Sequence, residues 1–80
     1  MKVTVELALG REIKKAREAL QKSQEALAFE AGIHRTYVSL LERGKKSPTL
    51  VVIVRLAHAL NVKPSELLRR VEVTLEQANI

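Results

Sequence analysis

The stretch SQEALAFEAGIHRTYVSLLERG, residues 23–44, decides the fold of this chain. Its pattern predicts two short helices joined by a tight turn around Gly32. Ser23 is a favoured N-cap residue, because its hydroxyl can accept a hydrogen bond from an unpaired N–H of the first helical turn. Gly32 ends the first helix, since glycine adopts the left-handed conformation without a steric penalty. The second helix is predicted over residues 34–43.

Composition and charge narrow the class of protein. The 80 residues contain no cysteine, so disulfides and thiolate metal sites are excluded and an apolar core has to stabilise the fold. No apolar run approaches the length of a membrane span and no signal-peptide pattern is present, so we expect a soluble, intracellular protein. The formal net charge of +5 favours a nucleic acid as the partner, with a membrane surface as the alternative.

Helical periodicity extends to both sides of this stretch. Residues 6–21 and 50–60 carry apolar side chains at intervals of three and four. The second of these segments is dense in β-branched residues, yet its period holds for longer than a typical strand. Thr49 is the predicted cap of the segment at residues 50–60. Pro64 suits the first position of a last helix that ends near Arg70. The inward positions predicted for the two segments are Leu9, Ile13, Ala16 and Leu20 in the first, and Leu50, Ile53, Leu56, Ala57 and Leu60 in the second.

We therefore expect one all-α domain over residues 1–80, a bundle of five helices whose core spans residues 7–70. Residues 1–6 and 71–80 alternate apolar with polar side chains and are predicted to be flanking tails, short strands or dimer contacts. Gly10 is expected to loosen the first turn, because glycine inside a helix costs about 1 kcal/mol relative to alanine.

The helix predicted at residues 34–43 has two different faces. At about 100° per residue, Val38 and Leu41 point toward the core. An arginine on the opposite face can bond a guanine edge, a hydroxyl can bond a base or a phosphate, and a leucine can pack on a thymine methyl group. The alternative is an ordinary solvated face with one exposed leucine. That outward face contains no acidic residue and consists of Arg35, Thr36, Ser39, Leu40 and Arg43.

Five short motifs follow one another at fixed spacing along the chain. They are Ser-Gln-Glu at 23–25, Ala-Gly-Ile at 31–33, Tyr-Val-Ser-x-Leu-Glu-x-Gly at 37–44, Ser-Pro-Thr-Leu at 47–50 and Leu-Ala-x-Ala-Leu at 56–60. With these motifs, residues 7–70 resemble the helix-turn-helix domains of the lambda-repressor and Cro type, also called the XRE family. At this length and with HRTY at residues 34–37, the chain looks most like the controller proteins of restriction–modification systems and small phage-type repressors.

The resemblance implies a cytoplasmic transcription regulator, encoded by a prokaryote or a phage. It would bind double-stranded DNA at a pseudo-palindromic operator, as a homodimer with half-sites about 34 Å apart. It also implies an ion pair between Arg17 and Glu42 that positions the recognition helix. Many members carry a polar residue at the position of Leu40, so a direct bond to a base is not expected there. The implied base contacts are Arg35, Thr36, Ser39 and Leu40, and the implied phosphate contacts are Gln24, Arg43, Lys45 and Lys46.

Two apolar features are not explained by DNA binding. Phe29 lies about 160° from the inward face of its helix, so either neighbouring chain ends or a partner protein would have to cover it. A second stripe on the helix at 50–60 is interpreted either as a dimer interface or as a surface covered by the tail at residues 71–75. That stripe consists of Val51, Val54, Arg55 and His58.

A function of another class is the alternative to a dedicated regulator. An antitoxin-like module would hold a toxin through Phe29 or the C-terminal tail and regulate its own gene through the same helix-turn-helix. We expect no enzyme activity and no cofactor, because no spacing of Ser, His and Glu indicates an activated nucleophile. We also expect no metal site, because His34 and His58 have no cysteine or aspartate nearby.

Overall fold

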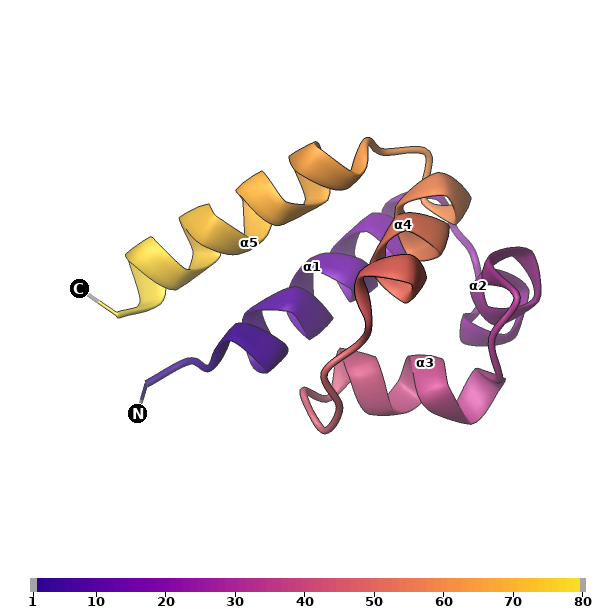
Figure 1. Cartoon of the computed structure of the whole chain (residues 1–80), viewed down its shortest axis with the longest axis horizontal. Coiled ribbons are helices and arrows are strands. Elements are labelled where there is room, and N and C mark those ends of the chain that lie inside the picture. The colour runs from indigo at the N-terminus through magenta and orange to yellow at the C-terminus, as the bar shows by residue number, and fades with distance from the viewer. Residues whose placement is uncertain (1, 80) are drawn as a thin grey trace.

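The computed structural model describes residues 2–79, which form five α-helices joined by short loops (Figure 1). The predicted all-α fold is confirmed. No helix among these residues is long and apolar enough to cross a membrane. The helices are α1 (Val5–Ala19), α2 (Gln24–Ala31), α3 (Arg35–Glu42), α4 (Leu50–Ala59) and α5 (Pro64–Ala78).

Short-range side-chain bonds begin the helices where the sequence predicts them. The Ser23 hydroxyl accepts from the N–H of Ala26 at 3.0 Å and caps α2. The Thr49 hydroxyl accepts from the N–H of Val52 at 3.2 Å and caps α4. Pro64 is the first residue of α5, where its missing N–H leaves no bond unmade.

One large apolar side chain from each helix meets in the centre of the molecule. These side chains are fully buried, and each lies on the inward stripe of its own helix. α1 contacts both α3 and α5, while α2 contacts α3 and α4, so α1 lies between the last helix and the helix-turn-helix. The five central residues are Ile13, Leu27, Leu41, Leu56 and Leu67.

The C-terminal flank differs from the prediction. Residues 71–78 continue α5 as helix, and residues 2–4 precede α1 without forming a strand. The reason is that Leu67, Val71 and Leu75 are spaced by four residues and lie on one side of a helix. Val71 is buried and Leu75 is partly buried against the core, so the apolar positions that mimic an alternating strand stabilise a helix instead.

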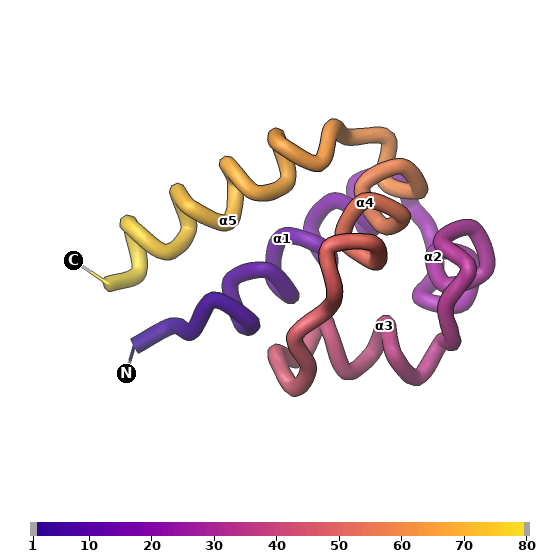
Figure 2. Tube along the Cα trace, viewed as in Figure 1, coloured from indigo at the N-terminus to yellow at the C-terminus, as the bar shows by residue number. Residues whose placement is uncertain are grey.

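The two ends of the described chain lie next to each other (Figure 2). The N–H of Val3 donates to Oδ1 of Asn79 at 3.0 Å, and Nδ2 of Asn79 donates to the carbonyl of Val3 at 3.1 Å. This reciprocal pair fixes the start of the chain against the end of α5.

Gly10 tightens the packing of α1 rather than loosening it. A Cβ at Gly10 would stand 2.3 Å from the carbonyl oxygen of Leu41, far inside van der Waals contact. The missing side chain therefore lets the end of α3 approach the backbone of α1, and the prediction of a loose turn is wrong.

Two predicted inward positions are exposed. Leu50 is 71% exposed and Leu20 is also on the surface. Leu50 is the first residue of α4 and Leu20 is the C-cap of α1, so both lie where a helix leaves the core.

Candidate nucleic-acid interface

A sharp turn at Gly32 sets the direction of α3 relative to α2. Gly32 has φ 72° and ψ 33°, the left-handed conformation that only glycine adopts freely. The N–H of Ile33 then donates to the carbonyl of Ala28 at 3.0 Å, which closes the end of α2. His34 begins α3, because its Nδ1 accepts from the N–H of Thr36 at 3.1 Å.

The inner face of α3 is held by Val38 and Leu41, both buried in the core as predicted. Of the residues predicted to contact bases, Arg35 and Thr36 are exposed, whereas Ser39 and Leu40 are partly buried. By helical spacing Thr36, Ser39 and Leu40 share the side of α3 that faces away from the core, and Arg35 lies between that side and the core face, in the first turn.

Basic side chains follow the end of α3. Arg43, Lys45 and Lys46 are exposed, and the N–H of Lys45 donates to the carbonyl of Leu40 at 2.9 Å. The guanidinium of Arg43 donates through Nε to the carbonyl of Ser39 at 3.3 Å, so it lies along its own helix. These charges lie where a helix C-terminus carries partial negative charge, which favours cations.

A buried carboxylate connects the first three helices. Glu42 is only 7% exposed and accepts two bonds from Arg17, at 2.7 Å from Nε and 2.9 Å from Nη2. Gln24, predicted to contact phosphate, is partly buried and donates its side-chain N–H to Glu42 at 2.9 Å. The hydrogen bond to Glu42 raises the pKa of the Arg17 guanidinium. The third donor group of Arg17 binds the carbonyl of Lys22 at 2.8 Å, so every part of its fork is used.

One neighbour of α3 was missed in the sequence analysis. The carboxylate of Glu25, in the first turn of α2, lies 3.5 Å from Nη1 of Arg35. Both side chains are exposed, so the pair is screened by water and can open at little cost. Helical spacing within α3 does not reveal this pair, because the acid comes from another helix. The only signal in the sequence is that Glu25 and Arg35 both lie in first turns.

The two unexplained apolar features remain at the surface. Phe29 is 87% exposed and Val51 is 59% exposed. Coverage of Phe29 by neighbouring chain ends is therefore wrong, as is coverage of the α4 stripe by the tail, which packs on the core as part of α5. Val54 is partly buried, and Arg55 and His58 are exposed beside it.

The chain is similar in sequence and in fold to known proteins. Residues 13–67 match the family model described as helix-turn-helix. The chain belongs to this family. It is 40% identical over 65 residues to the control protein C.BamHI of Bacillus amyloliquefaciens, with 80% of each chain covered. It is 43% identical to the restriction–modification controller protein C.AhdI from Aeromonas hydrophila, whose crystal structure superposes with a TM-score of 0.74 and covers 76% of this chain and 92% of that one.

A more distant helix-turn-helix structure extends the likeness over nearly the whole chain. The controller protein C.Esp1396I, solved as a tetramer with its natural 35 base-pair operator, is 23% identical and has a TM-score of 0.83. The match covers 94% of this chain and 99% of that one, and at this identity it shows the fold alone.

These matches confirm the predicted XRE-type membership and the likeness to restriction–modification controllers. They place the helix-turn-helix chain among DNA-binding transcription regulators. They do not support the antitoxin alternative.

Proposed function

We propose that this helix-turn-helix protein regulates transcription as a controller-type homodimer, bound to a pseudo-palindromic operator with α3 in the major groove. The observation that carries the proposal is the combination of an exposed Arg35–Thr36 edge on α3 with a basic segment directly after it. An α-helix fits the major groove, and cations beside it can bind the phosphates at the groove edge.

The two sets of residues have different tasks. Arg35 and Thr36 project furthest and read base edges, whereas Ser39 and Leu40 are partly buried and add a hydroxyl and an apolar contact close to the helix axis. Arg43, Lys45 and Lys46 bind phosphates and supply affinity that does not depend on sequence. Gln24 reaches phosphate through the part of its amide that Glu42 does not use.

The buried ion pair between Arg17 and Glu42 holds α3 in place. Arg17 and Glu42 connect α1 to the end of α3, and a recognition helix that cannot tilt loses less entropy on binding. The weak Arg35–Glu25 pair holds the arginine near its working position in the free protein and opens when a guanine edge replaces the carboxylate.

The dimer forms through the exposed stripe of α4, which consists of Val51, Val54, Arg55 and His58. The exposed Val51 and the partly buried Val54 lie on one helix face and suit an isologous contact between two copies. The oligomeric state of C.Esp1396I on its operator supports an assembly of this kind. The proposed function is one of binding DNA in the cytoplasm, with no catalytic role.

The experiment that tests base reading compares two single changes on a selected operator and on scrambled DNA. Arg35→Ala should cost about 1–3 kcal/mol on the operator and relax sequence preference. Lys46→Ala should weaken binding to both DNAs and reduce the salt slope by about one unit.

Lys63→Ala is the matched control for the loss of one positive charge. Lys63 is the N-cap residue of α5, and Figure 1 shows the start of α5 on the other side of the molecule from α3. Removal of its charge should therefore leave the operator affinity nearly unchanged. Unchanged sequence preference in Arg35→Ala would contradict the base-reading role.

Dimer formation is tested separately by Val51→Glu. The charge should convert a dimer into a monomer in light scattering and weaken operator binding, because the second half-site is no longer held. A Val51→Glu protein that remains dimeric would show that another surface joins the copies.

A further inference from the structure

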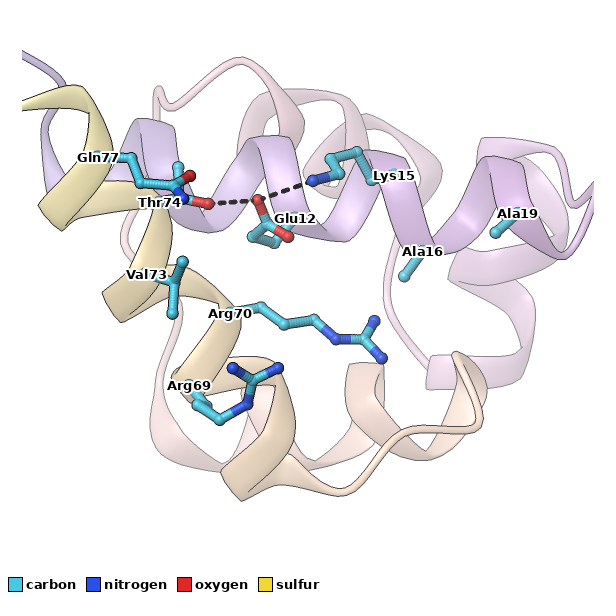
Figure 3. Close-up of a pocket in the computed structure, with 9 residues that line it drawn as sticks. All are labelled: Glu12, Lys15, Ala16, Ala19, Arg69, Arg70, Val73, Thr74 and Gln77. Atoms are coloured by element: carbon cyan, nitrogen blue, oxygen red, sulfur yellow. Dashed lines mark hydrogen bonds and ion pairs between the residues drawn. The ribbon is translucent and has the colours of Figure 1, made fainter.

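A groove of about 410 Å³ opens between α1 and α5, on the surface of α1 that does not contact α3 (Figure 3). Glu12, Lys15 and Ala16 line it from α1, and Arg70 and Thr74 face them from α5. None of these residues belongs to the proposed DNA-binding surface. The groove has the size of many small-molecule sites and combines small apolar walls with charged groups.

Glu12 provides a buried carboxylate at the base of the groove. It is 4% exposed, and its Oε2 accepts from the Thr74 hydroxyl at 2.6 Å and lies 3.6 Å from Nζ of Lys15. Its other oxygen, Oε1, has no hydrogen-bond partner among residues 2–79. In Figure 3 this second oxygen is turned toward the space between the helices. No buried side-chain oxygen among residues 2–79 lacks a partner, so Oε1 reaches solvent in the groove and can accept from a ligand that replaces water there.

The opposite wall offers donors that are not fully used. Arg69 donates both Nε and Nη2 to Glu66, at 2.8 and 2.9 Å, so its fork is occupied. Arg70 donates only Nε to Glu66, at 2.9 Å, and no bond within residues 2–79 uses its two Nη groups. Figure 3 shows the Arg70 side chain extended along the groove toward Ala16 of α1. Two free Nη groups match the two oxygens of a carboxylate.

We propose that the α1–α5 groove binds a small zwitterion, a molecule that carries an ammonium group and a carboxylate group. The ammonium group donates to Oε1 of Glu12, and the carboxylate accepts from the Nη groups of Arg70. A simple cation would be repelled by Arg70 and Lys15, and a simple anion would be repelled by the carboxylate of Glu12. Ala16 supplies an apolar surface for the carbon chain that joins the two charges.

The experiment titrates the full-length protein with a series of amino acids of increasing separation between their charges. Glycine, β-alanine and γ-aminobutyrate are added at constant ionic strength, and binding is followed by amide chemical shifts. We expect saturable shifts confined to the groove residues of α1 and α5, with one chain length bound best. Acetate and methylammonium, each with one of the two charges, should bind at least about tenfold more weakly.

Two substitutions test the assigned atoms. Arg70→Gln removes the guanidinium that binds the ligand's carboxylate. It should lower the affinity for the amino acid that binds best by at least about tenfold. Glu12→Gln keeps an oxygen for Thr74 but turns an amide N–H toward the ligand's ammonium group, with the same expected loss. Arg69→Gln is the matched control, because the Arg69 fork is taken by Glu66, and it should change the affinity by less than about threefold.

Three results would overturn the proposal. No saturable shift with any of the three amino acids would show that the groove binds no zwitterion. Acetate or inorganic phosphate that binds as tightly as the best amino acid would show a simple anion site. Should both Arg70→Gln and Glu12→Gln bind like the unchanged protein, the ligand would lie elsewhere.

Discussion

Two carboxylates of this molecule each bridge two side chains, in opposite surroundings. Glu42 is buried and accepts from Arg17 and Gln24, which lie on different helices. Glu66 is on the surface of α5 and accepts from Arg69 and Arg70 of the same helix. The bond lengths are similar, between 2.7 and 2.9 Å.

Location, and not bond geometry, decides what such a cluster contributes to the stability of the fold. Around Glu66 water and salt screen the charges, and the partners would be near each other in any folded α5. Around Glu42 the carboxylate is desolvated and its donors arrive only when three helices pack, so losing one donor leaves a charge that water cannot reach. The cluster around Glu42 therefore reports on tertiary packing, and the cluster around Glu66 reports on one helix.

The largest expected effect comes from Arg17→Ala. Removing the guanidinium leaves the Glu42 carboxylate buried without its main partner, which should lower the free energy of unfolding by about 3–5 kcal/mol. Urea denaturation followed by circular dichroism measures it. The double variant Arg17→Met with Glu42→Leu should lose less than Arg17→Ala alone, because no uncompensated charge remains. Equal losses would mean that packing of the arginine stem, and not its charge, is what matters.

The next effect comes from Gly10→Ala, which probes the same contact between α1 and α3 without changing a charge. The added methyl group would stand 2.3 Å from the carbonyl oxygen of Leu41, next to Glu42. Overpacking of this kind should destabilise by about 1–3 kcal/mol, even though alanine is the better helix former. The thermal midpoint measures the change, with Ala19→Gly at the exposed end of α1 as the control for helix propensity. A stabilised Gly10→Ala protein would refute the close approach.

The smallest effect is expected at Glu66. Hydrogen bonds from Arg69 and then Arg70 lower the pKa of its carboxyl group from 4.5 to about 2. Because the folded-state pKa is the lower one, this stabilisation is present above the unfolded pKa and disappears as the pH falls through about 2. Glu66→Gln should leave the urea midpoint at neutral pH nearly unchanged, since the carboxylate is only partly covered and water screens its charge.

The titration of Glu66 can be followed directly by carboxyl carbon chemical shifts. Arg69→Gln should raise the Glu66 pKa more than Arg70→Gln does, because Arg69 supplies the larger contribution. A larger rise with Arg70→Gln would show that Arg70 interacts with Glu66 more strongly than Arg69 does. Arg70 would then be held at Glu66 and not at the proposed ligand in the groove.

Features that depend on neighbours within one turn could be predicted from the sequence. Ser23 and Thr49 cap helices, and Gly32 turns the chain, because each acts on backbone groups a few residues away. The position of Arg17 opposite Glu42 came from the family resemblance, and the structure has this pair. The buried faces of α2 and α3 could be predicted from the helical spacing of their apolar residues alone.

What could not be predicted depends on segments that meet only in the folded chain. Gly10 was interpreted from its helix propensity, whereas its role is set by the α3 backbone that packs on it. Glu25 and Arg35 meet because a turn brings two helix starts together. Val71 and Leu75 satisfy both a period of two and a period of four, so the pattern alone could not distinguish a strand from the continuation of α5. The contacts of Arg35 and its neighbours with DNA stay predictions.

The reciprocal bonds between Val3 and Asn79 make the described chain nearly a closed ring. A short linker could join these two ends. The chain could then be opened in another loop without a change in how the helices pack. A circular permutant that is opened in the loop before α5 would keep α1 to α3 intact and would present α5 first. A second protein fused before Val3 or after Asn79 would be joined at the same corner of the molecule (Figure 2).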